Sequence, residues 1–170
     1  MMKLPMVLPL LALTACATPG LPPPSTDVEL RHTEDARAVF QASGDRWRDG
    51  VGAALFYADK VTQAYERLGV PLEAQHIVLV FHGDAAYHLL NDAAFARYDQ
   101  RADPTQTQNP NAAVIQRLAE RGVRVEICAS TMEQRGWERD DLLPEIIVAP
   151  NAFPRIIDLQ MDGYAHLDFD

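Results

Sequence analysis

The segment Ile77-Val78-Leu79-Val80-Phe81, followed directly by His82-Gly83, decides the fold of this 170-residue chain. Its unbroken run of large apolar side chains predicts a β-strand that is buried on both faces. Strands of this kind are typical of parallel sheets, which are covered by helices on both sides. The rest of the chain is therefore expected to alternate strands with helices.

Strand and helix patterns alternate on both sides of this segment. Short apolar runs predict further strands over residues 36–41, 123–128 and 146–149, and an edge strand over 164–169. Helical spacing, capping residues and terminal glycines predict helices over 51–68, 84–98, 110–121, 130–136 and 151–162. The helix over 130–136 is expected to open with a capping box of Ser130 and Glu133. The alternation predicts the α/β class, as a single doubly wound, mainly parallel sheet of four to five strands with helices on both faces.

The N-terminal residues have the composition of an export signal. Lys3 supplies a positive start, and the apolar run over 4–13 is too short and too interrupted by proline to span a bilayer permanently. The sequence Leu13-Thr14-Ala15-Cys16 resembles the lipoprotein signal, in which cleavage before the cysteine frees it for acylation. We therefore expect a signal peptide at 1–15 and lipidation of Cys16. A secretory cleavage that leaves Cys16 as an incidental thiol is the alternative.

Beyond the predicted cleavage site, the chain divides into a tether and one domain. The prolines among residues 19–24 predict a stiff, extended, lipidated tether over 16–25. Residues 26–170 have the length of one ordinary domain. Ala17 in place of an aspartate, by resemblance to the sorting of bacterial lipoproteins, favours the outer membrane. The expected location is the periplasmic side of a bacterial membrane, with membrane contact through the lipid anchor only.

Charge and composition argue against several classes of ligand. The formal net charge is −9, and loss of residues 1–15 removes only the positive charge of Lys3, which gives −10 for the mature chain. Such an acidic surface repels polyphosphates, so we expect no nucleic-acid partner. No G-x-G-x-x-G motif follows the first predicted strand, and the histidines form no i, i+4 pair and no tight cluster with Cys128. We expect no cofactor and no metal ion.

Cys128 is the strongest candidate for chemistry. Sites in parallel α/β sheets lie beyond the carboxyl ends of the strands, and Cys128 ends the predicted strand over 123–128. The amides of the following turn favour the thiolate, so we expect a pKa below the roughly 8.5 of an ordinary cysteine. Glu126 is expected to alternate away from the thiol along the strand. A buried cysteine that acts only as a small hydrophobe is the alternative.

Other polar residues follow the predicted strands or open the predicted helices. His82, after the strand over 77–81, can bind a substrate, polarise a thiol or simply satisfy backbone carbonyls. Asn109 and Asn111 are explained as a helix entry, and they can also face a pocket. The candidate substrate-binding residues are Gly83, Asn109, Asn111, Ser130 and Thr131.

An ordered series of motifs carries a family resemblance. The motifs are Val80-Phe81-His82-Gly83, Asn109-Pro110-Asn111, the Gly122-Val123 turn, Cys128-Ala129-Ser130-Thr131-Met132-Glu133-Gln134-Arg135-Gly136, Asp141-Leu142-Leu143-Pro144, Leu159-Gln160 and Gly163-Tyr164. From about Ala36 to Phe169 the chain resembles the DsrE-like (DsrE/DsrF-type sulfur relay) family. The resemblance implies a small α/β subunit in trimers or hexamers, with a persulfide on Cys128 as in the sulfur-relay members. Those members are cytoplasmic, whereas this chain has the features of an exported lipoprotein.

Three functions are compatible with these residues. The leading hypothesis is a sulfur carrier or sulfurtransferase-like protein in which Cys128 is catalytic and His82 positions the donor. Its partners would be a sulfane-sulfur donor and an acceptor thiol, and the protein would be a homo-oligomer. The second hypothesis is a non-catalytic binding or assembly subunit of a DsrE-like oligomer, in which Cys128 is only packed. The third is a redox-sensing thiol that passes through sulfenic acid.

Overall fold

The computed structural model describes residues 27–98 and 103–169. The predicted signal peptide, Cys16 and the tether over 16–25 lie outside the described residues. The described residues contain a five-stranded sheet in the order β6-β5-β4-β1-β7, in which every neighbouring pair is parallel. Its strands are β1 (Ala36–Ala42), β4 (Gln75–Phe81), β5 (Arg124–Cys128), β6 (Ile147–Ala149) and β7 (Ala165–Asp168). The predicted α/β class with a parallel sheet is confirmed.

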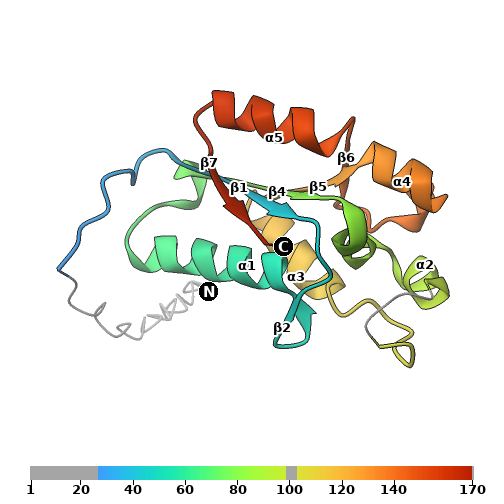
Figure 1. The fold of residues 1–170 in the computed structure, drawn as a ribbon. Coiled ribbons are helices and arrows are strands. Elements are labelled where there is room, and N and C mark those ends of the chain that lie inside the picture. The colour runs from blue at the N-terminus through green and yellow to red at the C-terminus, as the bar shows by residue number, and fades with distance from the viewer. Residues whose placement is uncertain (1–26, 99–102, 170) are drawn as a thin grey trace, which may run out of the picture.

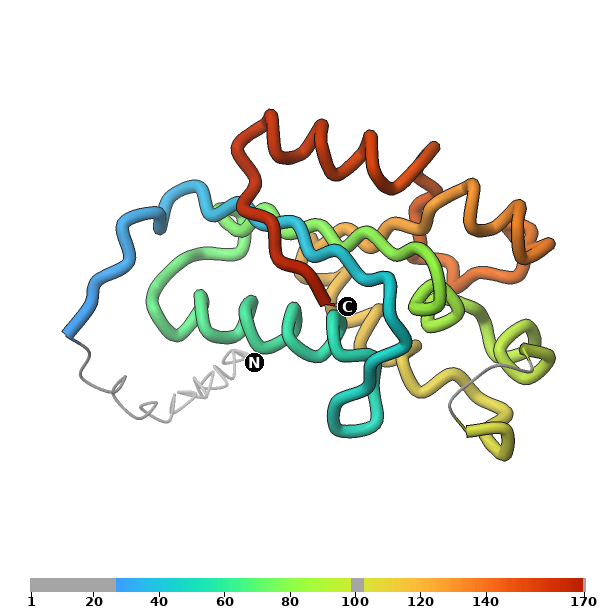
Figure 2. Tube along the Cα trace, in the orientation of Figure 1, coloured from blue at the N-terminus to red at the C-terminus, as the bar shows by residue number. Residues whose placement is uncertain are grey.

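Helices cover both faces of the sheet, as Figures 1 and 2 show. On one face lie α1 (Ala53–Arg67) and α3 (Ala112–Glu120), and on the other lies α5 (Ala152–Met161). The shorter elements are β2 (Trp47–Arg48), β3 (Val51–Gly52), α2 (Asp92–Arg97), α4 (Ala129–Arg135) and the 3₁₀ helices η1 (Leu72–Ala74), η2 (Gly83–Leu89) and η3 (Arg139–Asp141). None of the helices in the described part of the chain is long and apolar enough to span a membrane.

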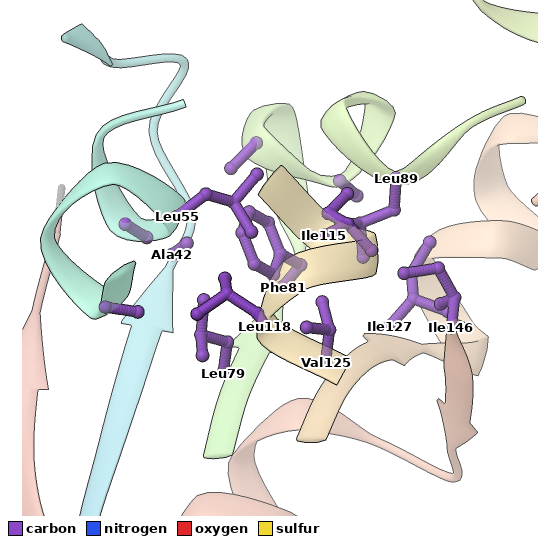
Figure 3. Packing of buried hydrophobic residues seen from close by; sticks show 14 of the residues in the cluster. Ala42, Leu55, Leu79, Phe81, Leu89, Ile115, Leu118, Val125, Ile127 and Ile146 are labelled. Carbon is purple, nitrogen blue, oxygen red and sulfur yellow. The ribbon is translucent and has the colours of Figure 1, made fainter. Parts of the chain in front are cut away.

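The core forms because side chains alternate between the two faces of each strand. Leu79 and Phe81 of β4 belong to the larger apolar cluster, on the side of α1 and α3, and Figure 3 shows Phe81 beside Leu55 of α1. Val78 and Val80 belong to a smaller cluster on the side of α5. Full burial of one such aliphatic or aromatic side chain contributes about 1.5–3 kcal/mol. The apolar run of β4 therefore stabilises both layers of helices at once.

The single helix predicted over 84–98 is wrong. The chain forms η2, adopts extended backbone at Leu90 and restarts as α2. Leu90 pairs with Leu142 in an isolated antiparallel bridge. The side chain of Asn91 caps the new helix by accepting a hydrogen bond from the amide of Ala94 at 2.9 Å. These contacts outweigh the helical propensity of the alanine-rich segment, which is worth only tenths of a kcal/mol per residue.

The helix predicted over 51–68 begins at Ala53, because the residues before it form a hairpin. Val51–Gly52 pairs with Trp47–Arg48 in antiparallel register. Gly52 lies against the buried ring of His88, and a Cβ at this position would be 2.4 Å from His88 Nδ1. A glycine is therefore required here by a close approach, which local helical periodicity does not reveal.

The strand order places the carboxyl end of β5 between two connections that run on opposite faces. The chain that leaves β4 reaches α3 on one face, and the chain that leaves β6 reaches α5 on the other (Figure 1). Strand β5 lies between β4 and β6 in the sheet. A crevice outside the strand ends at such a point is the usual ligand site of open α/β sheets. The last residue of β5 is Cys128.

Candidate functional site

Cys128 ends β5 and is also the N-cap residue of α4. Its backbone is extended, and the helix begins at Ala129 with no side-chain cap. The capping box predicted for Ser130 is therefore not formed: the helix starts earlier, and the hydroxyl oxygen of Ser130 accepts a hydrogen bond from Nδ2 of Asn151 at 3.2 Å. The thiol lies at the point where an N-terminal helix turn exposes its unpaired amides.

The first turns of two helices donate hydrogen bonds to the sulfur of Cys128. Burial of the side chain, which is 4% exposed, raises the pKa of the thiol. The amides of Thr131 and Ala152, the hydroxyl of Thr131 and the amide of Ser130 lower it, and together they outweigh burial. The pKa of Cys128 is therefore lowered, in the predicted direction. Because Ala152 is the first residue of α5, the positive ends of α4 and α5 both face the sulfur.

Glu126 lies on the same face of β5 as Cys128, so the expectation that it alternates away from the thiol is wrong. Residues two apart in a strand share a face, and Glu126 is buried beneath α5. Arg155 of α5 binds its carboxylate in a bidentate manner, with distances of 2.8 and 3.1 Å, and Arg124 adds a contact at 3.0 Å. Two cations therefore offset the negative charge that would otherwise oppose a thiolate at Cys128.

His82 and Gly83 connect the end of β4 to the thiol site. The amide of Gly83 donates to the hydroxyl oxygen of Thr131 at 3.4 Å, and this hydroxyl in turn bonds the sulfur of Cys128. Gly83 has a positive φ of 57°, and a Cβ there would be 3.1 Å from the carbonyl oxygen of Ser43. The ring of His82 lies 5.2 Å, centroid to centroid, from the ring of Phe153 in the first turn of α5.

The structure thus brings together five of the predicted site residues: Cys128, His82, Gly83, Ser130 and Thr131. Asn109 and Asn111 are held elsewhere. Asn109 Nδ2 donates to the carbonyl oxygens of His88 and Leu90 at 2.8 and 2.6 Å, and Asn111 Oδ1 accepts from the amide of Gly52 at 2.7 Å. Both side chains are buried. They hold η2 and the hairpin against the start of α3, which is a structural role.

Sequence reasoning missed three groups of this site: the amide of Ala152, the ring of Phe153 and the side chain of Gln41. Gln41 Nε2 lies 3.1 Å from Nε2 of His82, and Gln41 Oε1 lies 2.9 Å from Nε2 of His166. Gln41 stands at the carboxyl end of a predicted strand, where site residues gather. This position is the one feature of the sequence that could have identified Gln41 as a site residue. Among the described residues, no three His, Cys, Asp or Glu side chains form a group that could hold a metal ion.

The described residues form a parallel α/β domain that carries a thiol of lowered pKa, Cys128, at the carboxyl edge of its sheet. The chain belongs to the DsrE/DsrF-like family, whose sequence profile matches residues 40–169. No curated protein matches the chain.

Solved structures that share this fold include the following two. A protein of unknown function from Methanobacterium thermoautotrophicum is 21% identical, with a TM-score of 0.57 over 79% of this chain and 100% of that one. The ychN protein from E. coli is 15% identical, with a TM-score of 0.50 over 79% of this chain and 99% of its own. At these identities the likeness establishes the fold alone.

The lowered pKa of Cys128 predicts how its reactivity depends on pH. Alkylation requires the thiolate, so the rate for the protein that starts at Ser25 should rise with a midpoint below about 8.5. Thr131→Val removes one hydrogen-bond donor from the sulfur and should move this midpoint upward. Ser130→Ala is the matched control, because only the amide of Ser130 contacts the sulfur. A midpoint above 8.5 in the parent protein, or reaction only after unfolding, would favour the buried-cysteine alternative.

Proposed function

We propose that this protein is a sulfur carrier that holds sulfane sulfur as a persulfide on Cys128. The observation that carries the proposal is the convergence of four hydrogen-bond donors from α4 and α5 on one sulfur atom. The thiolate is the nucleophilic form of cysteine, and these donors favour it. Membership of the DsrE/DsrF-like family supports the same chemistry.

Sulfur transfer at Cys128 needs no external oxidant or reductant. The thiolate attacks the outer sulfur of a donor such as thiosulfate, the donor's sulfur–sulfur bond breaks, and sulfite leaves with the electron pair. Cys128 then carries a persulfide. The thiolate of an acceptor attacks its outer sulfur and takes it, and Cys128 leaves as a thiolate. The same amides that stabilise the starting thiolate also stabilise this leaving group.

His82 and Gly83 supply the remaining polar surface near the thiol. Through Thr131, the amide of Gly83 is coupled to the sulfur, and the His82 ring packs against Phe153 of α5. In the proposed reaction His82 positions the sulfane-sulfur donor. The expectation of no metal ion and no cofactor stays a prediction.

The proposal is tested by the intact mass of the protein that starts at Ser25, measured before and after incubation with thiosulfate or with polysulfide. The expected result is a gain of one sulfur atom that a thiol reductant removes. A separate incubation with hydrogen peroxide, which supplies the oxidant that sulfenic acid formation needs, tests the redox-sensing alternative, and a reductant-sensitive gain of one oxygen atom would support it. An unchanged mass with both donors would contradict sulfur carriage.

A second candidate function, an assembly subunit, is favoured by one surface of α5. Phe153, Ile157 and Met161 follow one another at helical spacing and are 61%, 56% and 84% exposed. Large apolar side chains gathered on one helix face are typical of protein interfaces. The stripe supports the expected homo-oligomer, and Phe153 would bring such an interface next to His82.

Light scattering tests the role of this apolar stripe. The protein that starts at Ser25 should have the mass of a trimer or hexamer, and Ile157→Asp should reduce it towards the monomer because a charge would be buried in the interface. Gln116→Asp, which adds the same charge to an exposed position of α3 on the other face of the sheet, is the control and should leave the mass unchanged. A parent protein that is monomeric at tens of micromolar contradicts the expectation.

We also propose that the mature chain is anchored to a membrane through acylated Cys16, on the basis of the Leu13-Thr14-Ala15-Cys16 motif. Several acyl chains together hold a protein firmly at a bilayer. Cys16→Ser should therefore move the protein from the membrane fraction to the soluble fraction. Cys128→Ser is the control and should remain with the membranes. Processing and membrane binding of Cys16→Ser like those of the parent would rule out the lipid anchor.

A further inference from the structure

Asn151 connects the starts of the two helices that surround the thiol. It is the N-cap residue of α5, and its Oδ1 accepts a hydrogen bond from the amide of Phe153 at 3.2 Å. Its Nδ2 donates to the hydroxyl oxygen of Ser130, in the first turn of α4, at 3.2 Å. One side-chain amide therefore contacts both helix starts.

The start of α5 has few amides to offer to a neighbouring group. An α-helix leaves the N–H groups of its first residues without partners inside the helix. Pro154, the third residue of α5, has no N–H, so the first three positions offer only the amides of Ala152 and Phe153. The side chain of Asn151 binds the amide of Phe153, and the sulfur of Cys128 binds the amide of Ala152.

The sheet brings Ala152 to the thiol. Cys128 and Ala149 are Cα partners in the parallel pair of β5 and β6, so the chain leaves β6 beside the thiol. Ala152 is 1% exposed and packs with Cys128 in the smaller apolar cluster. The direction of its N–H depends on how the first turn of α5 is held, and an N-cap side chain is the group that holds such a turn.

From these contacts we propose that Asn151 is a positioning residue that holds the amide of Ala152 on the sulfur of Cys128. By capping Phe153, its side-chain oxygen fixes the first turn of α5 with the N–H of Ala152 pointing at the sulfur. The inference deepens the proposed function, because it names a residue that sets the reactivity of the same thiol. It rests on that function only where sulfur loading is concerned.

The charges around the thiol do not change when an uncharged residue replaces Asn151. The ionisable groups on the elements around the thiol are Glu126 with its partners Arg124 and Arg155, His82 after β4, the exposed Glu133 of α4 and Asp158 of α5. All of them remain in such a variant. A change in the pKa of Cys128 therefore reports the hydrogen bond from Ala152.

The rate of Cys128 alkylation across pH tests the positioning role. The sample is the protein that starts at Ser25, which contains every residue that the structure describes. In Asn151→Ala the midpoint should move up towards the roughly 8.5 of an ordinary cysteine, because the thiolate loses a donor. Asn151→Ser keeps an oxygen that can cap Phe153, so it should keep the midpoint of the parent.

Asn91→Ala is the matched control. Asn91 is the N-cap residue of α2, accepts from the amide of Ala94 at 2.9 Å and donates to the carbonyl oxygen of Asp140 at 2.6 Å. Its loss weakens a helix start other than the two that contact the sulfur, so the midpoint should stay that of the parent. If Asn151→Ala does not fold, Asn151→Gly replaces it, since glycine also lacks the capping oxygen and is tolerated at an N-cap.

The amide resonance of Ala152 reports the contact with the sulfur directly. A hydrogen bond to a thiolate is stronger than one to a thiol, so this resonance should shift in ¹H–¹⁵N spectra of the parent as Cys128 ionises. The shift should be smaller in Asn151→Ala and retained in Asn151→Ser and Asn91→Ala. Equal alkylation midpoints in Asn151→Ala and Asn91→Ala, or equal shifts of the Ala152 resonance in both, would overturn the inference.

Sulfur loading separates this inference from the proposed function. With thiosulfate, at a pH below the midpoint of the parent, Asn151→Ala should load sulfur more slowly than Asn91→Ala. The smaller thiolate fraction outweighs the higher nucleophilicity of the more basic thiolate. The expected midpoints in a protein that takes up no sulfur would leave the role of Asn151 intact and refute the carrier function. Loading by the parent, with equal rates in Asn151→Ala and Asn91→Ala, would overturn the positioning role.

Discussion

Replacing Cys128 by serine is expected to abolish uptake of sulfane sulfur, with the signal falling to that of a blank. Serine keeps the size of the side chain and the four donors around it, but its hydroxyl is not ionised near neutral pH and does not attack sulfane sulfur. The measurement is the intact mass after incubation with thiosulfate and with polysulfide. The fold should be preserved, which thermal unfolding of the variant can verify.

A second variant, Thr131→Val, tests how much one hydrogen-bond donor contributes to the reactivity of Cys128. It keeps the thiol and loses only one donor to the sulfur, so it should load sulfur to the same final extent but more slowly near neutral pH. Uptake of sulfur by Cys128→Ser would place the carrier atom elsewhere in the chain. Equal rates for Thr131→Val and the parent would contradict activation by the hydrogen bonds around the thiol.

Arg155→Met is expected to lower the free energy of unfolding by about 3 kcal/mol, because it leaves the carboxylate of Glu126 buried without its bidentate partner. Glu126 is 1% exposed, and only the contact from Arg124 remains in the variant. Urea unfolding monitored by circular dichroism gives the value. Asp158→Asn is the control, because Asp158 contacts the same arginine from an exposed position, and its effect should lie within about 0.5 kcal/mol.

A double variant shows whether the loss of stability in Arg155→Met comes from the unpaired charge of Glu126. Glu126→Leu combined with Arg155→Met replaces the ion pair by apolar side chains and should recover most of the stability lost in Arg155→Met. A double variant as unstable as Arg155→Met would attribute the loss to packing against α5. A single variant as stable as the parent would show that the contact from Arg124 is sufficient for the buried carboxylate of Glu126.

The sequence by itself determined the class of the fold and the position of the thiol. The apolar run over 77–81 can be satisfied only by burial on both faces, which requires helices on both sides of a parallel sheet. A parallel sheet collects its sites at the carboxyl ends of its strands. The positions of strand ends alone therefore indicated Cys128, His82 and Gly83. The structure places all three at the carboxyl ends of two neighbouring strands, β4 and β5.

Only the tertiary structure decided which groups surround that thiol and what the other polar residues do. Ala152 and Gln41 lie far from Cys128 in the sequence, and they reach this edge of the sheet through the parallel packing of β1, β4, β5 and β6. Contacts between distant segments also explain the structural role of Asn109, whose side chain binds the carbonyl oxygens of His88 and Leu90. They explain why the helix predicted over 84–98 is interrupted at Leu90, which pairs with Leu142. Local propensities contribute tenths of a kcal/mol per residue, whereas burial and hydrogen bonding between distant segments contribute about a kcal/mol or more each, so the long-range contacts prevail.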